Sequence, residues 1–284
     1  MEKGGLDAAV TVVSIPRFPP TPEGRETAKR AAFDGIASIK RTIEQSPERI
    51  GLGLAPEDAY RFEKEGRRTA FIGLESGDAI ETDLSLLGSF YEQGVRFLKL
   101  RGDVDNAICE DRGLGEFGVK VVHECNRLGL VIDVGGCSPR AIGDVLAASR
   151  APVVCSGGAA LALCDAPDNL ADGTIAAIAA ADGVVLIPFD PGRLIPPGSS
   201  QHAGIADIAA HIGHVSKLVG PEAVGIGSNF GGGGGVRGCR DAAEVIGLSV
   251  ELLRRGMGEH EIEAIWGGNV MRVFKQAASL AVAR

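Results

Sequence analysis

Residues 126–155, NRLGLVIDVGGCSPRAIGDVLAASRAPVVC, hold the pattern that decides the fold. The end of a helical stretch is followed by Gly129, a short apolar run and a Gly-Gly turn. Ser138 and Pro139 then open a second helical stretch, which leads into another apolar run. A serine before a proline is typical of a helix start, and a glycine after the last helical turn is typical of a helix end. The segment therefore predicts a strand, a helix and a second strand.

The same alternation continues on both sides of this segment. Apolar runs without polar alternation predict strands that are buried on both faces, as in a parallel sheet. The predicted strands are Ala8–Ile15, Thr69–Leu74, Val95–Leu100, Leu130–Val134, Val153–Cys155, Gly183–Phe189 and Ala223–Gly227. The predicted helices include Glu23–Glu44, Asp83–Gln93, Glu116–Leu128, Pro139–Ala148, Asn169–Ala181 and Ile205–Val219. This order predicts an α/β fold, a (β/α)8 barrel of the TIM type, with a doubly wound open sheet as the alternative.

The length of the chain fits one such barrel. Its 284 residues compare with the about 250 residues of a typical TIM barrel. We therefore predict a single domain over residues 1–284, with C-terminal helices from about residue 241. These helices are expected to break near Gly256–Gly258 and near Gly267–Gly268.

Charge and hydropathy exclude two classes of partner. The net charge of -8 argues against nucleic acid and against an anionic membrane surface. No apolar run reaches the about 18 residues that a membrane span needs. The first residues lack the basic start and apolar stretch of a signal peptide, so we expect a cytoplasmic protein. None of the six cysteines forms a C-x-x-C pair, and free thiols are expected.

Polar residues at the strand ends are the candidate catalytic or ligand-binding groups, because barrel enzymes place their chemistry there. They are Glu75, Arg101, Asp103 and Asn229. Glu75 could act as a general base or a substrate ligand, or it could pair with Arg101 or Arg112. Arg101 and Asp103 could bind a carboxylate or phosphate, or they could form a surface ion pair.

Metal ligands are scarce at these strand ends. A two-metal site needs several His and carboxylate ligands around ions about 3.5–4 Å apart. The middle strands end in glycines, and the five histidines fall on predicted helices or in a charged segment. His211 and His214 share a helix face and could bind zinc, but polar or core-edge positions are the simpler interpretation. We therefore predict no metal site and no cofactor.

Three further features have an ordinary structural explanation that we favour. Lys99 lies in an apolar strand and could form a Schiff base, but a lysine can also extend past a helix to solvent. Cys137 and Cys155 could be nucleophiles, but no neighbouring base is evident and buried small side chains suffice. The Gly231–Gly235 run could bind phosphate through its N–H groups, but it lacks the lysine of a P-loop.

Several stretches, in order along nearly the whole chain, resemble the renal (membrane) dipeptidase family of metallopeptidases. They are Lys3–Ala8, Phe71–Gly77, Gly113–Gly118, Asn126–Val134, Ala151–Val154, Val224–Ser228, Leu252–Gly256 and Trp266–Asn269. The resemblance implies a (β/α)8-barrel hydrolase that uses two zinc ions. It also implies that the bridging glutamate of the metal site falls on Glu75.

Most other positions of the family's site carry no suitable side chain here. The resemblance puts the catalytic histidine on Gly102 and the two later metal-binding histidines on Gly136 and Gly157. The aspartate after the last strand falls on Asn229, and its neighbour two residues on falls on Gly231. The substrate-binding arginine falls near Asp168, which has the opposite charge.

The family's first strand, with its His-x-Asp pair, has no counterpart in this sequence. A barrel that lacks this strand would expose two sheet edges. A partner or another segment would then cover the gap, or the barrel would close with fewer strands. A homo-oligomer, such as a homodimer, is therefore expected.

These observations favour a barrel that has lost zinc-dependent dipeptide hydrolysis. It would bind or transform an amino-acid-like or dipeptide-like small molecule without metal. One alternative is a non-catalytic binding or regulatory homologue. A second alternative is an active metallodipeptidase whose ligands have moved to other positions.

Overall fold

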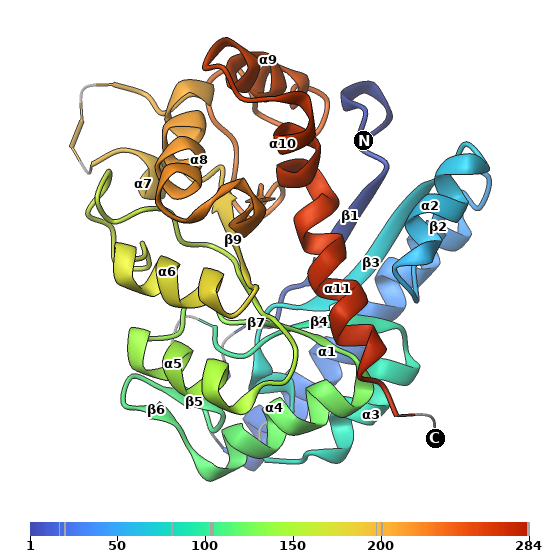
Figure 1. Cartoon of the computed structure of the whole chain (residues 1–284). Helices are drawn as coiled ribbons and strands as arrows, with labels where there is room; N and C mark the ends of the chain where they lie inside the picture. The colour runs from blue at the N-terminus through green and yellow to red at the C-terminus, as the bar shows by residue number, and fades with distance from the viewer. Residues whose placement is uncertain are drawn as a thin grey trace. The chain divides into compact units, whose positions relative to one another are not determined.

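The computed structural model describes residues 1–282 except 17, 20, 81, 103, 104, 197 and 200. The chain divides into two compact units, whose elements are labelled in Figure 1. The N-terminal unit consists of Asp7–Pro152 and Phe274–Arg284. The C-terminal unit consists of Met1–Leu6 and Val153–Val273. A single domain over residues 1–284 stays a prediction.

The N-terminal unit is built on parallel strands. β3 pairs with β1 along one edge and with β2 and then β4 along the other, and β4 pairs with β7. Their bounds are β1 (Ala8–Val13), β2 (Ile50–Leu52), β3 (Arg68–Leu74), β4 (Val95–Lys99) and β7 (Val131–Asp133). The parallel arrangement is possible because a long crossover connects each strand to the next.

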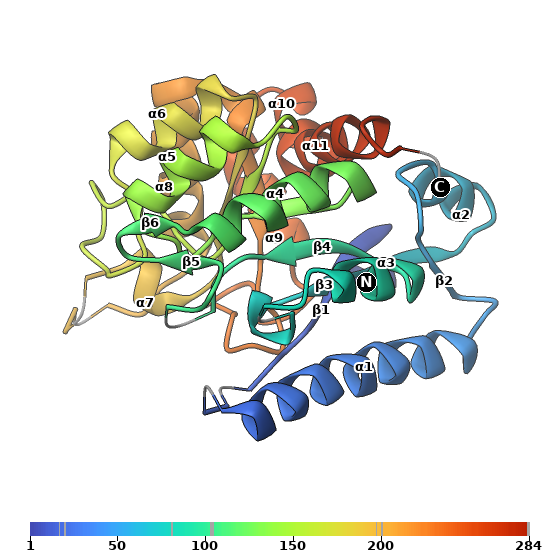
Figure 2. The ribbon, with the colours of Figure 1, turned by 90° about the horizontal axis from the view of Figure 1, so that it is seen from below.

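Helices form most of these crossovers. Their bounds are α1 (Pro22–Glu44), α2 (Glu57–Lys64), α3 (Ser85–Glu92), α4 (Glu116–Leu128) and α5 (Pro139–Ala148). As predicted, Ser138 Oγ accepts a 3.1 Å hydrogen bond from the Ala141 N–H, and Pro139 begins α5. Gly129 ends α4 with a φ of 76°, also as predicted. The long helix α1 contacts β1, β2 and β3, and Figure 2 shows its full length.

An aromatic cluster forms part of the core of this unit. Phe274 lies on α11 (Asn269–Ser279), and its ring centroid is 5.3 Å from that of Phe71 and 5.2 Å from that of Phe97. Phe71 is on β3 and Phe97 is on β4, and all three side chains are buried. Burial of each ring contributes about 1.5–3 kcal/mol to stability. The cluster holds β3 and β4 in place below their carboxyl ends.

The C-terminal unit repeats the parallel pattern with fewer strands. β8 pairs with β9, with Val154 opposite Val184. β9 also pairs with β10, beginning with Val185 opposite Val224. The strands are β8 (Val154–Cys155), β9 (Val184–Pro188) and β10 (Val224–Gly227). The helices are α6 (Asp172–Ala180), α7 (Pro191–Leu194), α8 (Ile205–Val219), α9 (Ile246–Arg254) and α10 (Glu259–Glu263).

All seven predicted strands are present, and the predicted α/β fold with parallel strands is confirmed. The short strand β2 was not predicted. Its central Gly51 leaves room for the Phe62 ring, which a Cβ at that position would meet at 2.5 Å, so the run lacks a strand-like apolar pattern.

The break predicted at Gly267–Gly268 is wrong. A π-helical segment, η4 (Ala264–Gly268), joins α10 to α11 at this point. A π-helical turn absorbs an extra residue while the backbone stays hydrogen-bonded, so the two glycines do not end the helix. The predicted break near Gly256 is confirmed, because this residue has a φ of 86° just after α9.

Candidate ligand site at the carboxyl ends of the strands

Three charged side chains end neighbouring strands of the N-terminal unit. Lys99 of β4 is the register partner of Asp133 of β7. Leu98 is the partner of Leu74, so Glu75, the residue after β3, comes next to Lys99. Side chains alternate along a strand, and strands lie about 4.8 Å apart, so Glu75, Lys99 and Asp133 form one row on one face of the sheet. We call them the strand-end row.

Glu75 is held by its backbone and not by its side chain. Its N–H donates a 3.1 Å hydrogen bond to the carbonyl of Val13, which continues the pairing of β3 with β1. The side chain is half-buried, and its carboxylate has no hydrogen bond or ion pair within the described part of the chain. The two arginines considered as its partners are engaged elsewhere, Arg101 with Asp105 and Asp111, and Arg112 with Glu110. The Glu75 carboxylate is therefore available to a ligand.

Lys99 lies beside the two glycines at the ends of β4 and β7. A Cβ built on Gly136 would lie 3.8 Å from Lys99 Cε and 3.3 Å from the Gly102 carbonyl oxygen. The positions that resemble the family's catalytic histidine and one metal-binding histidine are thus neighbours in space. Lys99 is half-buried, and the described residues offer its ammonium group no hydrogen bond or ion pair.

Asp133 completes the strand-end row and was not among the predicted site residues. Its Oδ1 accepts a 2.9 Å hydrogen bond from the Gly135 N–H, so the carboxylate helps to shape the Gly-Gly turn. The sequence does show an acidic residue at this strand end. Only the register with Lys99 shows that it faces the same side as the other two.

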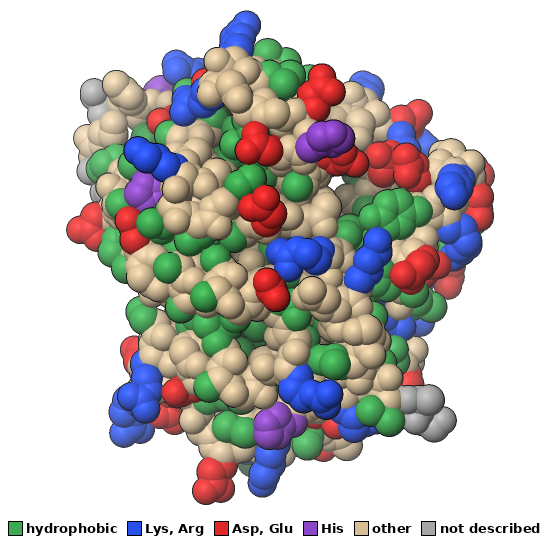
Figure 3. Space-filling model, viewed as in Figure 1, with side chains coloured by type: hydrophobic (Ala, Val, Ile, Leu, Met, Phe, Trp, Pro, Cys, Tyr) green, Lys and Arg blue, Asp and Glu red, His purple; other side chains and the backbone are tan. Residues whose placement is uncertain are grey.

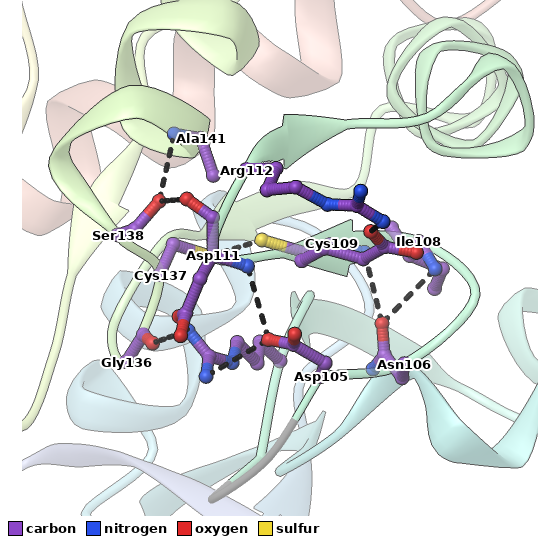
Figure 4. A network of polar contacts seen from close by, with 12 residues as sticks. Asp105, Asn106, Ile108, Cys109, Asp111, Arg112, Gly136, Cys137, Ser138 and Ala141 are labelled. Atoms are coloured by element: carbon purple, nitrogen blue, oxygen red, sulfur yellow. Dashed lines mark hydrogen bonds and ion pairs between the residues drawn. The ribbon is translucent and has the colours of Figure 1, made fainter.

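Arg101 connects three loops next to this row. Its guanidinium lies 3.0 Å from Asp105 and 2.8 Å from Asp111, and it donates a 3.1 Å hydrogen bond to the Gly136 carbonyl. Figure 4 shows Asp105, Asp111 and Gly136 converging in this network. The Arg101 side chain is 12% exposed, whereas its partners Asp105 and Asp111 are 49% and 72% exposed, so the two ion pairs lie at the surface. Binding of a ligand by Arg101 stays a prediction, and the predicted Asp103 lies outside the described residues.

Asn229 belongs to the C-terminal unit, in the loop after β10. It is exposed, and its φ of 57° is in the left-handed region that asparagine tolerates. Its Nδ2 donates a 3.1 Å hydrogen bond to the Gly232 carbonyl, so the side chain closes the turn at the start of the glycine run. A catalytic role for Asn229 stays a prediction.

Asp168, also in the C-terminal unit, is paired with an arginine. It forms an ion pair with Arg193 of α7, which also lies 3.8 Å from Asp190. The position that resembles the family's substrate-binding arginine therefore carries an acid whose charge is balanced inside the unit.

The helix-borne histidines have separate structural partners. His211 is buried in α8, where Nδ1 accepts a 3.0 Å hydrogen bond from the Ala160 N–H and Nε2 lies 3.1 Å from the Leu194 carbonyl. His214 lies 2.8 Å from Asp172. The hydrogen bonds fix His211 as the neutral tautomer with its proton on Nε2. Burial lowers its pKa below the ordinary value of 6.5, since a buried charge is unfavourable.

This lowered pKa predicts a loss of stability in mild acid. Below pH 6.5 the unfolded chain takes up a proton that the folded His211 resists, so stability is complete above 6.5 and falls as the pH decreases. We expect the urea midpoint to be lower at pH 5 than at pH 7.5. His211→Gln should cost about 1–3 kcal/mol at pH 7.5 and should reduce the difference between the two pH values. The exposed His123→Gln is the control and should change neither midpoint; an unchanged pH difference in His211→Gln would contradict the prediction.

The donor set does not fit a two-zinc centre. Among the described residues, no three His, Cys, Asp or Glu side chains come together in a group that could hold a metal ion. Gly136 and Gly157 have φ values of 78° and 77°, a conformation that side chains with a Cβ rarely adopt. The backbone at these two positions, where the resemblance implies histidines, therefore favours glycine.

Charges of both signs are mixed on the part of the surface that Figure 3 shows. Acidic, basic and hydrophobic side chains are interspersed on the face shown in Figure 3, with no continuous basic area there of the kind that binds nucleic acid. No helix in the described residues combines the length and the apolar character that a membrane crossing needs.

Comparison with known proteins agrees with the sequence resemblance. The family model described as membrane dipeptidase, peptidase family M19, matches residues 1–283. Dipeptidase 3 of Rattus norvegicus is 35% identical over 262 residues, which cover 88% of this chain and 52% of that protein. An uncharacterized dipeptidase of Schizosaccharomyces pombe is 32% identical over 269 residues, covering 90% of this chain and 64% of that protein. The chain thus spans about half to two thirds of the length of these relatives.

Solved structures show the same fold. The probable dipeptidase PvdM of Pseudomonas aeruginosa has a TM-score of 0.90 at 25% identity, over 99% of this chain and 88% of that one. The structure of dipeptidase AC, a metallopeptidase, also has a TM-score of 0.90, at 22% identity over 98% of this chain and 88% of that one. The predicted TIM-barrel-like fold is confirmed by these matches.

Proposed function

Because this chain belongs to the membrane dipeptidase family, we propose that it binds an amino-acid-like or dipeptide-like small molecule at the strand-end row without metal, and that it has lost zinc-dependent dipeptide hydrolysis. The observation that carries the proposal is that Glu75 and Lys99 end neighbouring strands and lie next to each other in the strand-end row. Neither the Glu75 carboxylate nor the Lys99 ammonium group has a hydrogen bond or ion pair with the described residues. A zwitterionic ligand offers one group of each charge to such a pair.

The loss of hydrolysis follows from the donor set. The family's two metal ions need several imidazoles and carboxylates, and Gly102, Gly136 and Gly157 offer none. Glu75 alone cannot hold two cations against their hydration in water. Without a metal, nothing lowers the pKa of a water molecule towards neutrality, so water does not provide hydroxide at neutral pH.

Binding follows from the same residues. The ammonium group of an amino acid would lie against Glu75, and a ligand carboxylate would lie against Lys99, in charge-assisted hydrogen bonds. Gly102 and Gly136, where the resemblance implies histidines, add no side chain to the site, and a Cβ on either would lie 3.2–3.3 Å from a neighbouring atom. Charged hydrogen bonds of this kind contribute about 1.5–3 kcal/mol each.

Isothermal titration calorimetry of the purified chain in EDTA tests the proposal. The probes are L-alanyl-L-alanine and a panel of free amino acids and dipeptides. We expect at least one probe to bind with the same Kd with and without EDTA. Lys99→Met and Glu75→Gln should each weaken that binding about tenfold or more, because 1.4 kcal/mol corresponds to a factor of ten.

The control for this titration is Lys120→Met. Lys120 is exposed on α4, so this substitution removes the same charge at a position away from the strand-end row. It should leave the Kd unchanged. The proposal fails if the panel shows no binding, or if all three variants bind equally well.

A further inference from the structure

Two buried thiols from distant parts of the N-terminal unit lie against each other beside the strand-end row. Cys109 Sγ is 3.1 Å from Cys137 Sγ, although the residues are 28 positions apart. Cys109 begins the hairpin of β5 (Cys109–Glu110) and β6 (Gly113–Leu114), and Cys137 follows the Gly-Gly turn after β7. Figure 4 shows the two side chains pointing at each other.

Both thiols are held in place by ordered loops. The Cys109 N–H donates a 2.9 Å hydrogen bond to Asn106 Oδ1, and the Cys137 N–H donates a 3.1 Å hydrogen bond to the Val134 carbonyl. Arg101 connects the two loops, because it contacts both Asp111, in the turn of the hairpin, and the Gly136 carbonyl. A disulfide bond is about 2.05 Å long, so closure requires the sulfurs to approach by only about 1 Å.

The pKa of the Cys109 thiol is shifted in the opposite direction from the pKa values of Cys125 and Cys239. The hydrogen bond with Cys137, helped by the charge of Arg101, lowers the pKa of Cys109 despite its burial. Burial, with a smaller contribution from neighbouring acids, raises the pKa of Cys125 and raises the pKa of Cys239 to about 11. A low pKa favours the thiolate, which is the reactive form in disulfide chemistry.

We propose that Cys109 and Cys137 form a reversible disulfide bond that makes the loops beside the strand-end row responsive to peroxide. Cys137 is 8% exposed and Cys109 is fully buried, so a molecule the size of hydrogen peroxide reaches Cys137 first. The Cys137 sulfur attacks one peroxide oxygen and becomes a sulfenic acid, and its proton goes to the other oxygen, which leaves as water. The Cys109 thiolate then attacks the Cys137 sulfur, the S–S bond forms, and the sulfenic oxygen takes up a proton and leaves as a second water.

The net reaction converts two thiols and one hydrogen peroxide into one disulfide and two waters, and a dithiol reverses it by thiol–disulfide exchange. The bond fastens the β5–β6 hairpin to the turn that carries Gly136, next to Lys99. It therefore fixes one wall of the site where the ligand is proposed to bind, but its formation does not depend on that ligand.

Oxidation of the purified full chain tests the proposal. After treatment with hydrogen peroxide, the number of titratable thiols in the denatured protein should fall from six to four. The intact mass should fall by the mass of two hydrogens, and peptide mapping should find the Cys109 and Cys137 peptides linked. Dithiothreitol should restore six thiols, and the oxidised form should melt roughly 5–10 °C higher because the unfolded chain is cross-linked.

Variants keep the test specific. Cys109→Ser and Cys137→Ser should each lose the cross-link, whereas Cys125→Ser, a buried cysteine of the same unit, should keep it. Peptide mapping of the oxidised, unsubstituted protein shows whether Cys109 and Cys137 are linked, even if a variant does not fold. Three results would each overturn the proposal. The first is a cross-link between other cysteines, and the second is oxygen added to a single sulfur without a cross-link. The third is that all six thiols persist in the folded protein under conditions that oxidise the denatured chain.

Discussion

The purified chain, supplied with excess zinc, is expected to hydrolyse L-alanyl-L-alanine no faster than a protein-free zinc solution. The physical reason is that Gly136 and Gly157 stand where the resemblance implies metal-binding imidazoles, and Gly102 where it implies the catalytic histidine, and a glycine supplies neither a ligand nor a base. Without several protein ligands, no zinc-bound water with a pKa near 7 forms at the site. Compared with an active relative, this chain is therefore expected to lack all of the metal-dependent rate of dipeptide hydrolysis.

Two measurements check this expectation together. Dipeptide hydrolysis is followed by the release of free alanine, with an active zinc dipeptidase as the positive control. Elemental analysis of the desalted protein should find far less than one zinc per chain. Gly136→His should not restore turnover, because a φ of 78° strains any residue with a Cβ and one imidazole does not complete the ligand set. Stoichiometric zinc with measurable turnover would revive the interpretation of an active dipeptidase with relocated ligands.

Phe274→Ala is expected to destabilise the chain by about 3–5 kcal/mol, the usual cost of removing a buried aromatic ring. The ring is 1% exposed and packs against Phe71 and Phe97, so its removal leaves a cavity under the carboxyl ends of β3 and β4. For a chain of this size, the melting temperature should fall by roughly 10 °C. The same cavity loosens the strands that align Glu75 with Lys99, so probe binding should weaken as well.

Gln276→Ala is the matched control for this substitution, because Gln276 is exposed on the same helix. It should shift the melting temperature by no more than a degree or two, since most exposed substitutions change stability by less than about 0.5 kcal/mol. Thermal unfolding followed by circular dichroism measures both variants. Equal melting temperatures for Phe274→Ala and Gln276→Ala would show that the aromatic cluster does not contribute to the core.

Much of the fold was predictable because its signals are local. Ser138 and Pro139 at a helix start, Gly129 at a helix end and the continuous apolar run Val153–Cys155 each report on a few neighbouring residues. The strand β2 and the π-helical joint at Gly267 escaped prediction. The first depends on the packing of Phe62 against Gly51, which neighbours in the sequence do not report, whereas a Cβ at Gly267 would meet no atom within 4 Å, so packing does not explain the second.

The candidate site was predictable only in part. Glu75 could be recognised as a charged residue after a buried strand, and the glycines at the family's histidine positions could be read directly. The choice between a ligand-binding and an ion-paired Arg101 could not be made, because its partners Asp105 and Asp111 reach it through the path of the following loop.

The sequence by itself determined most of the helices and strands and their order, and it showed glycines where the resemblance implies histidines. Tertiary structure alone decided that Glu75, Lys99 and Asp133 stand in one row, and that Cys109 and Cys137 touch across 28 residues. Local propensities depend on a few neighbouring residues. Strand register and loop closure bring together groups that are far apart in the sequence, and their separation along the chain does not predict their distance in space.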